Sequence, residues 1–202
     1  IYNDKDNKKV HVLIARTNVK SYDYGSVPSE YDYTKLGQTW SSPRITRIPN
    51  SGAGDTVIDD DLNVAIMGGG YDDTDEAIGS NLTIVNLDNL GKINKVIPLN
   101  NITNNNITNS APNTPLVLTP DTVGDSNIYR GALVYLNDLE GKITKFNLTN
   151  MEKDKDGNSI EMYDSTQIFS VDANDKNGRY MYHSMDATLS LIHISEPTRL
   201  EP

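Results

Sequence analysis

Residues 132–148, which read ALVYLNDLEGKITKFNL, constrain the fold more than any other stretch of the chain. The stretch begins with a largely apolar run, passes through a polar turn at 137–141 and continues as an alternating run at 142–148. A short loop that ends in glycine between two such runs indicates a β-hairpin, because glycine adopts positive φ without steric cost. The pattern predicts that the first strand is the more buried one. A single hairpin is not stable in water, so further strands are required.

Two consecutive sets of four strands are predicted from short apolar and β-branched runs that lie between turn residues. The first set comprises residues 42–48, 62–67, 81–87 and 92–99, and the second comprises residues 115–119, 132–136, 142–148 and 166–171. The run at 62–67 is almost continuously apolar, which indicates burial on both faces. No stretch shows the 3.6-residue period and the caps of a long helix, so the chain is expected to be all-β.

The two sets look like copies of one unit. Ser42-Pro43 opens the first and Thr114-Pro115 opens the second, and the two prolines are 72 positions apart. Repeated four-stranded antiparallel units predict blades of a β-propeller. A β-sandwich is the alternative, because short strands between turns serve both folds.

The propeller interpretation divides the chain into three parts. Residues 1–29 are expected to be the end of a preceding blade and its loop, and residues 30–188 a partial propeller with two blades and the start of a third. Residues 189–202 contain LSLIHISEPTR, which resembles a translated sequencing adapter, so this tail is expected to be non-native and the chain a metagenomic fragment. Because the chain starts at Ile1 and shows no signal peptide, it is interpreted as an internal fragment.

Composition excludes several classes of function. Acidic residues number 28 against 18 basic ones, and a formal net charge of −10 argues against a nucleic-acid surface. There is no cysteine, which excludes disulfides and thiolate chemistry. His11, His183 and His193 fall in no spaced metal or catalytic motif, and no G-x-S-x-G sequence occurs. The chain is therefore predicted not to be an enzyme.

Three segments carry a resemblance to a known family. They are residues 36–45 (LGQTWSSPRI), 65–72 (AIMGGGYD) and 134–148 (VYLNDLEGKITKFNL). In this order they resemble the patterns LG-x-TWS-x-P, GxGY and VYxxDxxGxxxxFDL of the C-terminal propeller of PilY-type proteins. Those proteins are type IV pilus tip-associated adhesins and pilus biogenesis factors of bacteria. The resemblance covers roughly residues 30–188, given the two-blade layout.

The resemblance implies a surface-displayed binding module. It implies export through the periplasm to the bacterial cell surface and the tip of the pilus (fimbrium), a part in cell adhesion, and control of pilus extension and retraction. The implied partners are minor pilins or a host or surface receptor. Direct membrane insertion and a small-molecule substrate are not expected.

The resemblance also implies calcium, bound in an Asp-rich loop before the second strand of a blade. The matching loop is 119–131, where Asp121, Asp125 and Asn127 offer side-chain oxygens and Val123 offers its carbonyl. The family's last aspartate has no counterpart, because Arg130 and Gly131 stand in its place. The alternative is a solvated turn rich in Asp and Asn.

Aromatic residues suggest where a partner would bind. Tyr22, Tyr24, Tyr31 and Tyr33 crowd one loop, and tyrosine supplies contact area at low entropic cost, so this loop is the predicted contact site. Trp40, the single tryptophan, is predicted to be a propeller core residue rather than an exposed adhesive aromatic.

Two other functions remain open. The turns DNLGK at 88–92 and DLEGK at 138–142 come close to the blade turn of quinoprotein (PQQ-type) dehydrogenases, although they are one residue shorter and occupy different turns within their blades. An unrelated secreted propeller that binds glycans or proteins is the third possibility.

Overall fold

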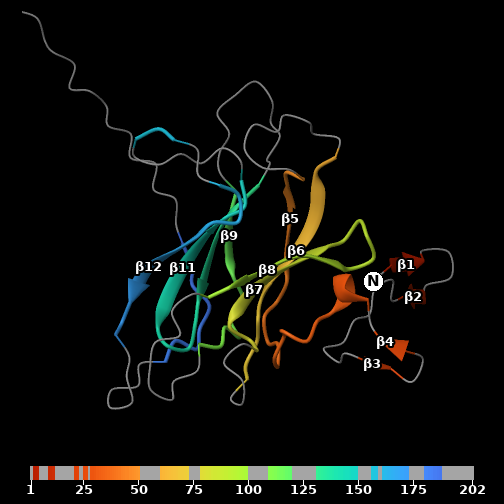
Figure 1. Cartoon of the computed structure of the whole chain (residues 1–202), viewed down its shortest axis with the longest axis horizontal. Helices are drawn as coiled ribbons and strands as arrows, with labels where there is room; N and C mark the ends of the chain where they lie inside the picture. Colours follow the sequence, from red (N-terminus) through yellow and green to blue (C-terminus); the bar gives the residue numbers. More distant parts are fainter. Residues whose placement is uncertain are drawn as a thin grey trace, which may run out of the picture.

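The fold is almost entirely β (Figure 1). The computed structural model describes residues 28–50, 60–72, 78–99, 109–119, 131–149, 156–158, 161–172 and 180–187. Before residue 28 it describes only the backbone of four short strands, β1 (Tyr2–Asp4), β2 (Lys9–His11), β3 (Ser21–Tyr22) and β4 (Gly25–Ser26), which pair as β1-β2 and β3-β4. The one helical element in the described part is the 3-10 turn η1 (Ser29–Tyr31). None of the described residues forms a helix that could span a membrane.

Two four-stranded antiparallel sheets form the body of the molecule. The first sheet consists of β5 (Arg44–Ile48), β6 (Leu62–Gly68), β7 (Asn81–Asn86) and β8 (Lys92–Pro98). The second sheet consists of β9 (Leu116–Leu118), β10 (Leu133–Asn137), β11 (Lys142–Asn147) and β12 (Ser165–Ser170). In both, strands that follow one another in the chain are neighbours, so the two predicted sets of four strands are confirmed. Neither sheet closes into a barrel or propeller in the described part of the chain.

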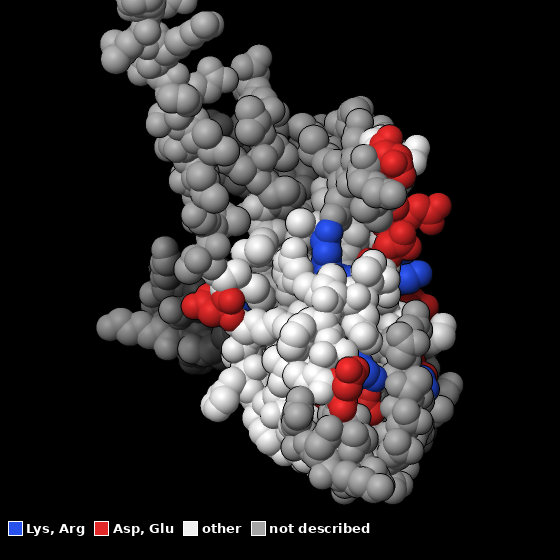
Figure 2. Space-filling model, turned by 90° about the vertical axis from the view of Figure 1, so that its left-hand side faces the viewer, with Lys and Arg blue, Asp and Glu red and all other residues white. Residues whose placement is uncertain are grey.

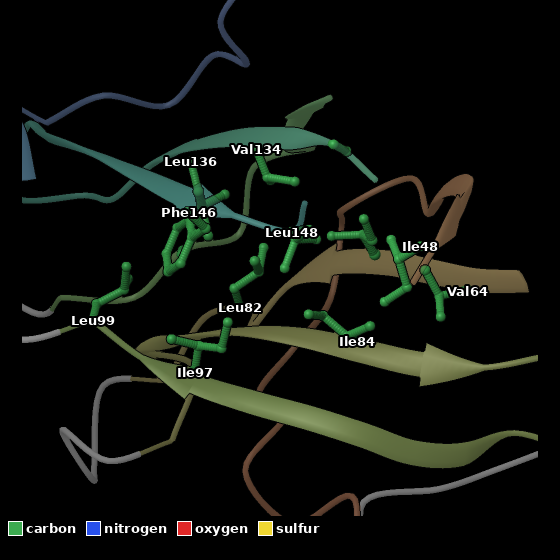
Figure 3. Packing of buried hydrophobic residues seen from close by; sticks show 13 residues of the cluster. Ile48, Val64, Leu82, Ile84, Ile97, Leu99, Val134, Leu136, Phe146 and Leu148 are labelled. Atoms are coloured by element: carbon green, nitrogen blue, oxygen red, sulfur yellow. The ribbon is translucent and has the colours of Figure 1, made fainter. Parts of the chain in front are cut away.

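The main core lies between the two sheets (Figure 3). The first sheet contributes apolar side chains from β5 to β8, and the second contributes them mainly from β10 and β11. These residues are Ile48, Val64, Ile66, Leu82, Ile84, Ile97, Leu99, Ala111, Ala132, Val134, Leu136, Phe146 and Leu148. Full burial of a side chain of this size contributes about 1.5–3 kcal/mol, so the contact between the sheets is the chief source of stability.

The opposite face of the first sheet has a core of its own. Tyr33, Ala65 and Val85 are buried there, and Leu36 and Met67 are among the partly buried residues that pack against them. β6 therefore buries Val64 and Ile66 on one face and Ala65 on the other. This confirms the burial on both faces that was predicted for residues 62–67.

The predicted hairpin is β10–β11, but its second strand is as buried as its first. Gly141 has φ 76° and closes the turn by donating to the carbonyl of Asp138 at 3.2 Å. Lys142, Thr144 and Phe146 alternate toward the inside and are all buried. The prediction that the first strand is more buried is wrong, because Lys142 and Thr144 occupy inward positions that alternation alone assigns to apolar residues.

Candidate interaction surfaces

The predicted calcium loop cannot be placed on this fold. Asp121, Val123, Asp125 and Asn127 lie outside the described residues. Within the described ranges, no group of three or more His, Asp or Glu side chains is placed to hold a metal ion. The calcium site therefore stays a prediction.

The predicted tyrosine contact loop is described only in part. Tyr22 lies in β3, where the backbone alone is described, and Tyr24 lies outside the described residues. Tyr31 is half-buried at the end of η1. Tyr33 is buried against the first sheet, and its hydroxyl donates to the carbonyl of Gly91 at 2.6 Å. This tyrosine thus fastens the 28–40 segment to the β7–β8 turn, which is a structural role.

Trp40 is not a core residue. Its side chain is 69% exposed and stacks on Tyr71, with ring centroids 6.1 Å apart and planes 8° apart. The backbone below the two rings is fixed, because Gln38 and Tyr71 exchange hydrogen bonds of 2.8 and 2.9 Å. The prediction of a core position is corrected. The segment that leads into β5 lies beside the residues that follow β6, where no described element covers the indole.

A buried cluster of charged residues occupies the β10–β11 turn, and sequence reasoning did not find it. Asp138, Glu140 and Lys142 are 2%, 3% and 9% exposed. The Lys142 ammonium pairs with Glu140 Oε2, and Asp138 Oδ1 accepts the Lys142 backbone N–H at 2.9 Å. Asn109 reaches in from the other side, and with its amide turned so that the nitrogen faces the two carboxylates it donates to Asp138 Oδ2 at 2.6 Å and to Glu140 Oε2 at 3.1 Å.

The electrostatics of this cluster follow from its burial. Burial raises the pKa of Asp138 to about 7, and the N–H and the ammonium of Lys142 oppose that rise. The turn is also held to residues 109–111, since Leu139 N–H donates to Ser110 O at 2.9 Å. Because every charge has a partner from the turn or from Asn109, the cluster fastens the second sheet to the segment that precedes it. The alternation of Asp138, Glu140 and Lys142 in the sequence is the only signal that could have revealed it.

The segments that lead into the two sheets, and residues 180–184 after the second sheet, are linked by the same kind of hydrogen bond. Ser42 N–H donates to Thr114 Oγ1 at 2.9 Å, and Thr114 N–H donates to Ser184 Oγ at 3.1 Å. These residues are 72 and 70 positions apart. We call residues 37–42, 109–114 and 180–184 the lead-in segments. The hydroxyl of each later segment thus accepts a backbone N–H from the segment before it.

The end of the second strand in each sheet receives the next lead-in segment. Gly68, the last residue of β6, packs so closely on that segment that a Cβ there would lie 2.3 Å from Ala111 O and 2.7 Å from Asn113 O. Asn137, the last residue of β10, donates its amide to Met181 O at 3.3 Å and His183 O at 3.1 Å. The lead-in segment at 180–184 therefore contacts the end of β10 in the second sheet, as the segment at 109–114 contacts the end of β6 in the first.

Comparisons with protein-family models, with curated proteins and with solved structures gave no match.

Proposed function

We propose that the two sheets are neighbouring blades of a β-propeller. The observation that carries this proposal is the repeat of the lead-in contacts, from Ser42 to Thr114 and from Thr114 to Ser184. A β-sandwich of two unlike sheets gives no reason for such a repeat, whereas radial repetition of one unit requires it. The third lead-in segment, residues 180–184, then introduces a further blade.

We further propose that this propeller is the binding scaffold of a PilY-type protein at the bacterial surface. The three segments that resemble the family fall at related places in the fold. Residues 36–45 form the first lead-in segment and the start of β5, residues 65–72 run from β6 to the Gln38–Tyr71 bridge, and residues 134–148 form the β10–β11 hairpin. A β scaffold that displays loops between its strands suits a non-enzymatic adhesin.

Immunogold electron microscopy of the bacterium that carries the gene tests the pilus assignment. Antibodies raised against this chain are expected to label pilus tips. Deletion of the gene is expected to reduce pilus-dependent adherence, and the intact gene to restore it. Label confined to the cytoplasm, or adherence unchanged after deletion, would contradict the assignment.

Calorimetric titration with CaCl2 tests the predicted calcium loop separately. Calcium prefers several carboxylate and carbonyl oxygens, so the heat of binding is expected to disappear when Asp125→Asn removes one carboxylate. Asp164→Asn, an exposed carboxylate before β12, is the matched control. Absence of saturable heat from the unsubstituted chain would remove calcium from the proposal.

A further inference from the structure

Three ionisable side chains and one amide meet inside the protein at the β10–β11 turn. Charged side chains elsewhere stand at the surface, as the red and blue groups in Figure 2 do. Asp138, Glu140 and Lys142 are instead almost completely buried. Asn109, which contacts them, is fully buried. Burying an ion pair costs free energy that an apolar pair of similar size does not, so packing alone gives no reason for these residue types.

The amine and the amide contact the same carboxylate oxygen. The Lys142 ammonium pairs with Glu140 Oε2, and the Asn109 amide lies 3.1 Å from that oxygen. The Asn109 amide also lies 2.6 Å from Asp138 Oδ2. A lysine and an asparagine that are far apart in the sequence are thus held next to each other, between two carboxyl groups. The flexible four-carbon stem of lysine lets its amine move the remaining distance to the amide carbon.

The backbone on both sides of this pair is fixed. Leu139 N–H donates to the carbonyl of Ser110, the neighbour of Asn109, at 2.9 Å. Lys142 N–H donates to Asp138 Oδ1 at 2.9 Å. Two reacting groups that are held in place in this way need no bimolecular encounter, which removes much of the barrier to a reaction between them.

Asp138 is suited to act as the acid in such a reaction. Burial raises the pKa of Asp138 to about 7, so near neutral pH a large share of the molecules carry its proton. The distance of 2.6 Å suits an O–H···O bond of about 2.5–3.0 Å, which forms when the Asn109 amide turns its oxygen toward protonated Asp138. This hydrogen bond draws electrons from the amide carbonyl and makes Asn109 Cγ more electrophilic.

We propose that Lys142 Nζ and Asn109 Cγ become joined by an isopeptide bond, which the protein forms by itself with Glu140 and Asp138 as catalytic groups. The bond ties the β10–β11 hairpin covalently to the lead-in segment at 109–114. The proposal rests on the buried cluster and depends neither on the propeller nor on the pilus assignment. Burial favours this bond because it keeps water, the competing nucleophile, away from the amide.

The reaction balances without an oxidant or a reductant. The Lys142 ammonium gives a proton to Glu140, and the neutral amine attacks Asn109 Cγ while Asp138 protonates Oδ1. Glu140 passes its proton to Nδ2 and accepts one from Nζ. The Cγ–Nδ2 bond then breaks, and Oδ1 returns its proton to Asp138. The ammonia that leaves takes the remaining proton from Glu140, so one ammonium ion is released for the one lysine ammonium that is consumed.

Mass spectrometry of the full chain tests the proposal. The intact mass is expected to be lower than that of the sequence by one ammonia. Trypsin does not cleave after an acylated lysine, so a digest is expected to contain peptide 96–130 joined to peptide 131–145. Fragmentation of this branched peptide is expected to place the link at Asn109 and Lys142. The stability of the noncovalent cluster alone is then measured on chain that keeps its full mass.

Matched variants identify the two joined residues. Lys142→Arg keeps the positive charge but cannot form the bond, and Asn109→Ala removes the electrophile, so both are expected to keep the full mass. Lys145→Arg and Asn94→Ser replace half-buried residues outside the cluster and are expected to lose ammonia like the unsubstituted chain. Circular dichroism checks that each variant is folded.

Two further variants separate the chemistry from the packing. Asp138→Asn and Glu140→Gln keep the size of the side chain but remove the acid and the base. Each is expected to slow the loss of ammonia after refolding by about a hundredfold. The Asn177-Gly178 pair can also lose ammonia, by cyclising on its own backbone, but that product joins no peptides and opens again in mild alkali.

The outcomes that would overturn the proposal are distinct. One is a folded chain that keeps its full mass after prolonged incubation at neutral pH. A second is loss of ammonia without a branched peptide, and a third is a loss that persists in Lys142→Arg. Loss of water within peptide 131–145 would show that Lys142 reacts with a carboxyl group of its own turn and not with Asn109.

Discussion

The two sheets share one strand order but complete their interiors differently. On the first sheet, β7 is buried at five consecutive residues, and its inward positions Leu82 and Ile84 are apolar. On the second sheet, β11 places Phe146 at the centre of the core and Lys142 at its end. The comparison shows that a sheet of this kind can bury a charged side chain when a neighbouring segment, here the one that contains Asn109, supplies hydrogen-bond partners.

The two sheets also differ in how their second strands meet the next lead-in segment. Gly68 lets the backbone of residues 111–113 approach directly, whereas Asn137 reaches Met181 and His183 with its side chain. In both sheets the lead-in segment that follows is held at the end of the second strand. The same position of the repeat is therefore occupied in two different ways, by a small residue that allows backbone contact and by a larger one that donates two hydrogen bonds.

The two phenylalanines give the sharpest test of the difference between the inner and outward faces. Phe146→Ala is expected to lower the free energy of unfolding by about 3–5 kcal/mol, because the side chain is fully buried between the sheets. Phe169→Ala, on the half-exposed outward face, is expected to cost less than about 1 kcal/mol in the monomer. Urea denaturation, read as a change of midpoint at constant slope, measures both. Equal costs would contradict the placement of the core.

The charged end of the second sheet is tested by removing its cation. Lys142→Met is expected to cost about 3 kcal/mol, because Glu140 and Asp138 then lose their buried positive partner. Lys145→Met, at a half-buried position on the other face of β11, is the matched control and is expected to cost less than about 1 kcal/mol. The double variant Glu140→Leu/Lys142→Met is expected to recover part of the loss. Indistinguishable midpoints for the two lysine variants would show that Lys142 is not needed there.

The turn of the second sheet is expected to make the stability of the protein depend on pH, because it contains Asp138. The pKa of Asp138 is raised from 3.8 to about 7, so the folded state binds this proton more tightly than the unfolded state does. The stability that protonated Asp138 contributes is complete below pH 3.8 and is lost as the pH rises through about 7. Asp138→Asn keeps an acceptor for the Lys142 N–H and is expected to flatten that slope, whereas Asp164→Asn leaves it in place. Chemical denaturation across this pH range measures the slope, and an unchanged slope in Asp138→Asn would contradict the assignment.

The smallest expected effect concerns the lead-in segments. Thr114→Val removes the hydroxyl that accepts Ser42 N–H, and Ser184→Ala removes the one that accepts Thr114 N–H. Each change is expected to cost about 0.5–1 kcal/mol, because both bonds are exposed to water. Thermal unfolding compares the two variants. If the repeat is real, the two costs agree, and a loss from only one of them would show that the lead-in segments are not equivalent.

Local patterns were sufficient to predict the strands. Period-two alternation and glycine-containing turns located all eight strands of the two sheets, since both signals act within a few residues. The hairpin at 132–148 and the burial of residues 62–67 on both faces were predicted for the same reason. The offset between Ser42-Pro43 and Thr114-Pro115 predicted that the two sheets are copies of one unit, and the lead-in contacts now support that prediction.

The sequence by itself therefore determined which residues form strands and in what order they pair. Only the tertiary structure decided which charged and aromatic side chains are buried, because their burial depends on residues far away in the chain. Trp40 is exposed where a core position was predicted, since among the described residues its indole stacks only on the ring of Tyr71. Lys142 and Asp138 are buried although the sequence indicated only a polar turn there, because Asn109 and the second sheet surround them. The local sequence around a charged or aromatic side chain is the same whether that side chain is buried or exposed. Its environment is decided only when the sheets pack.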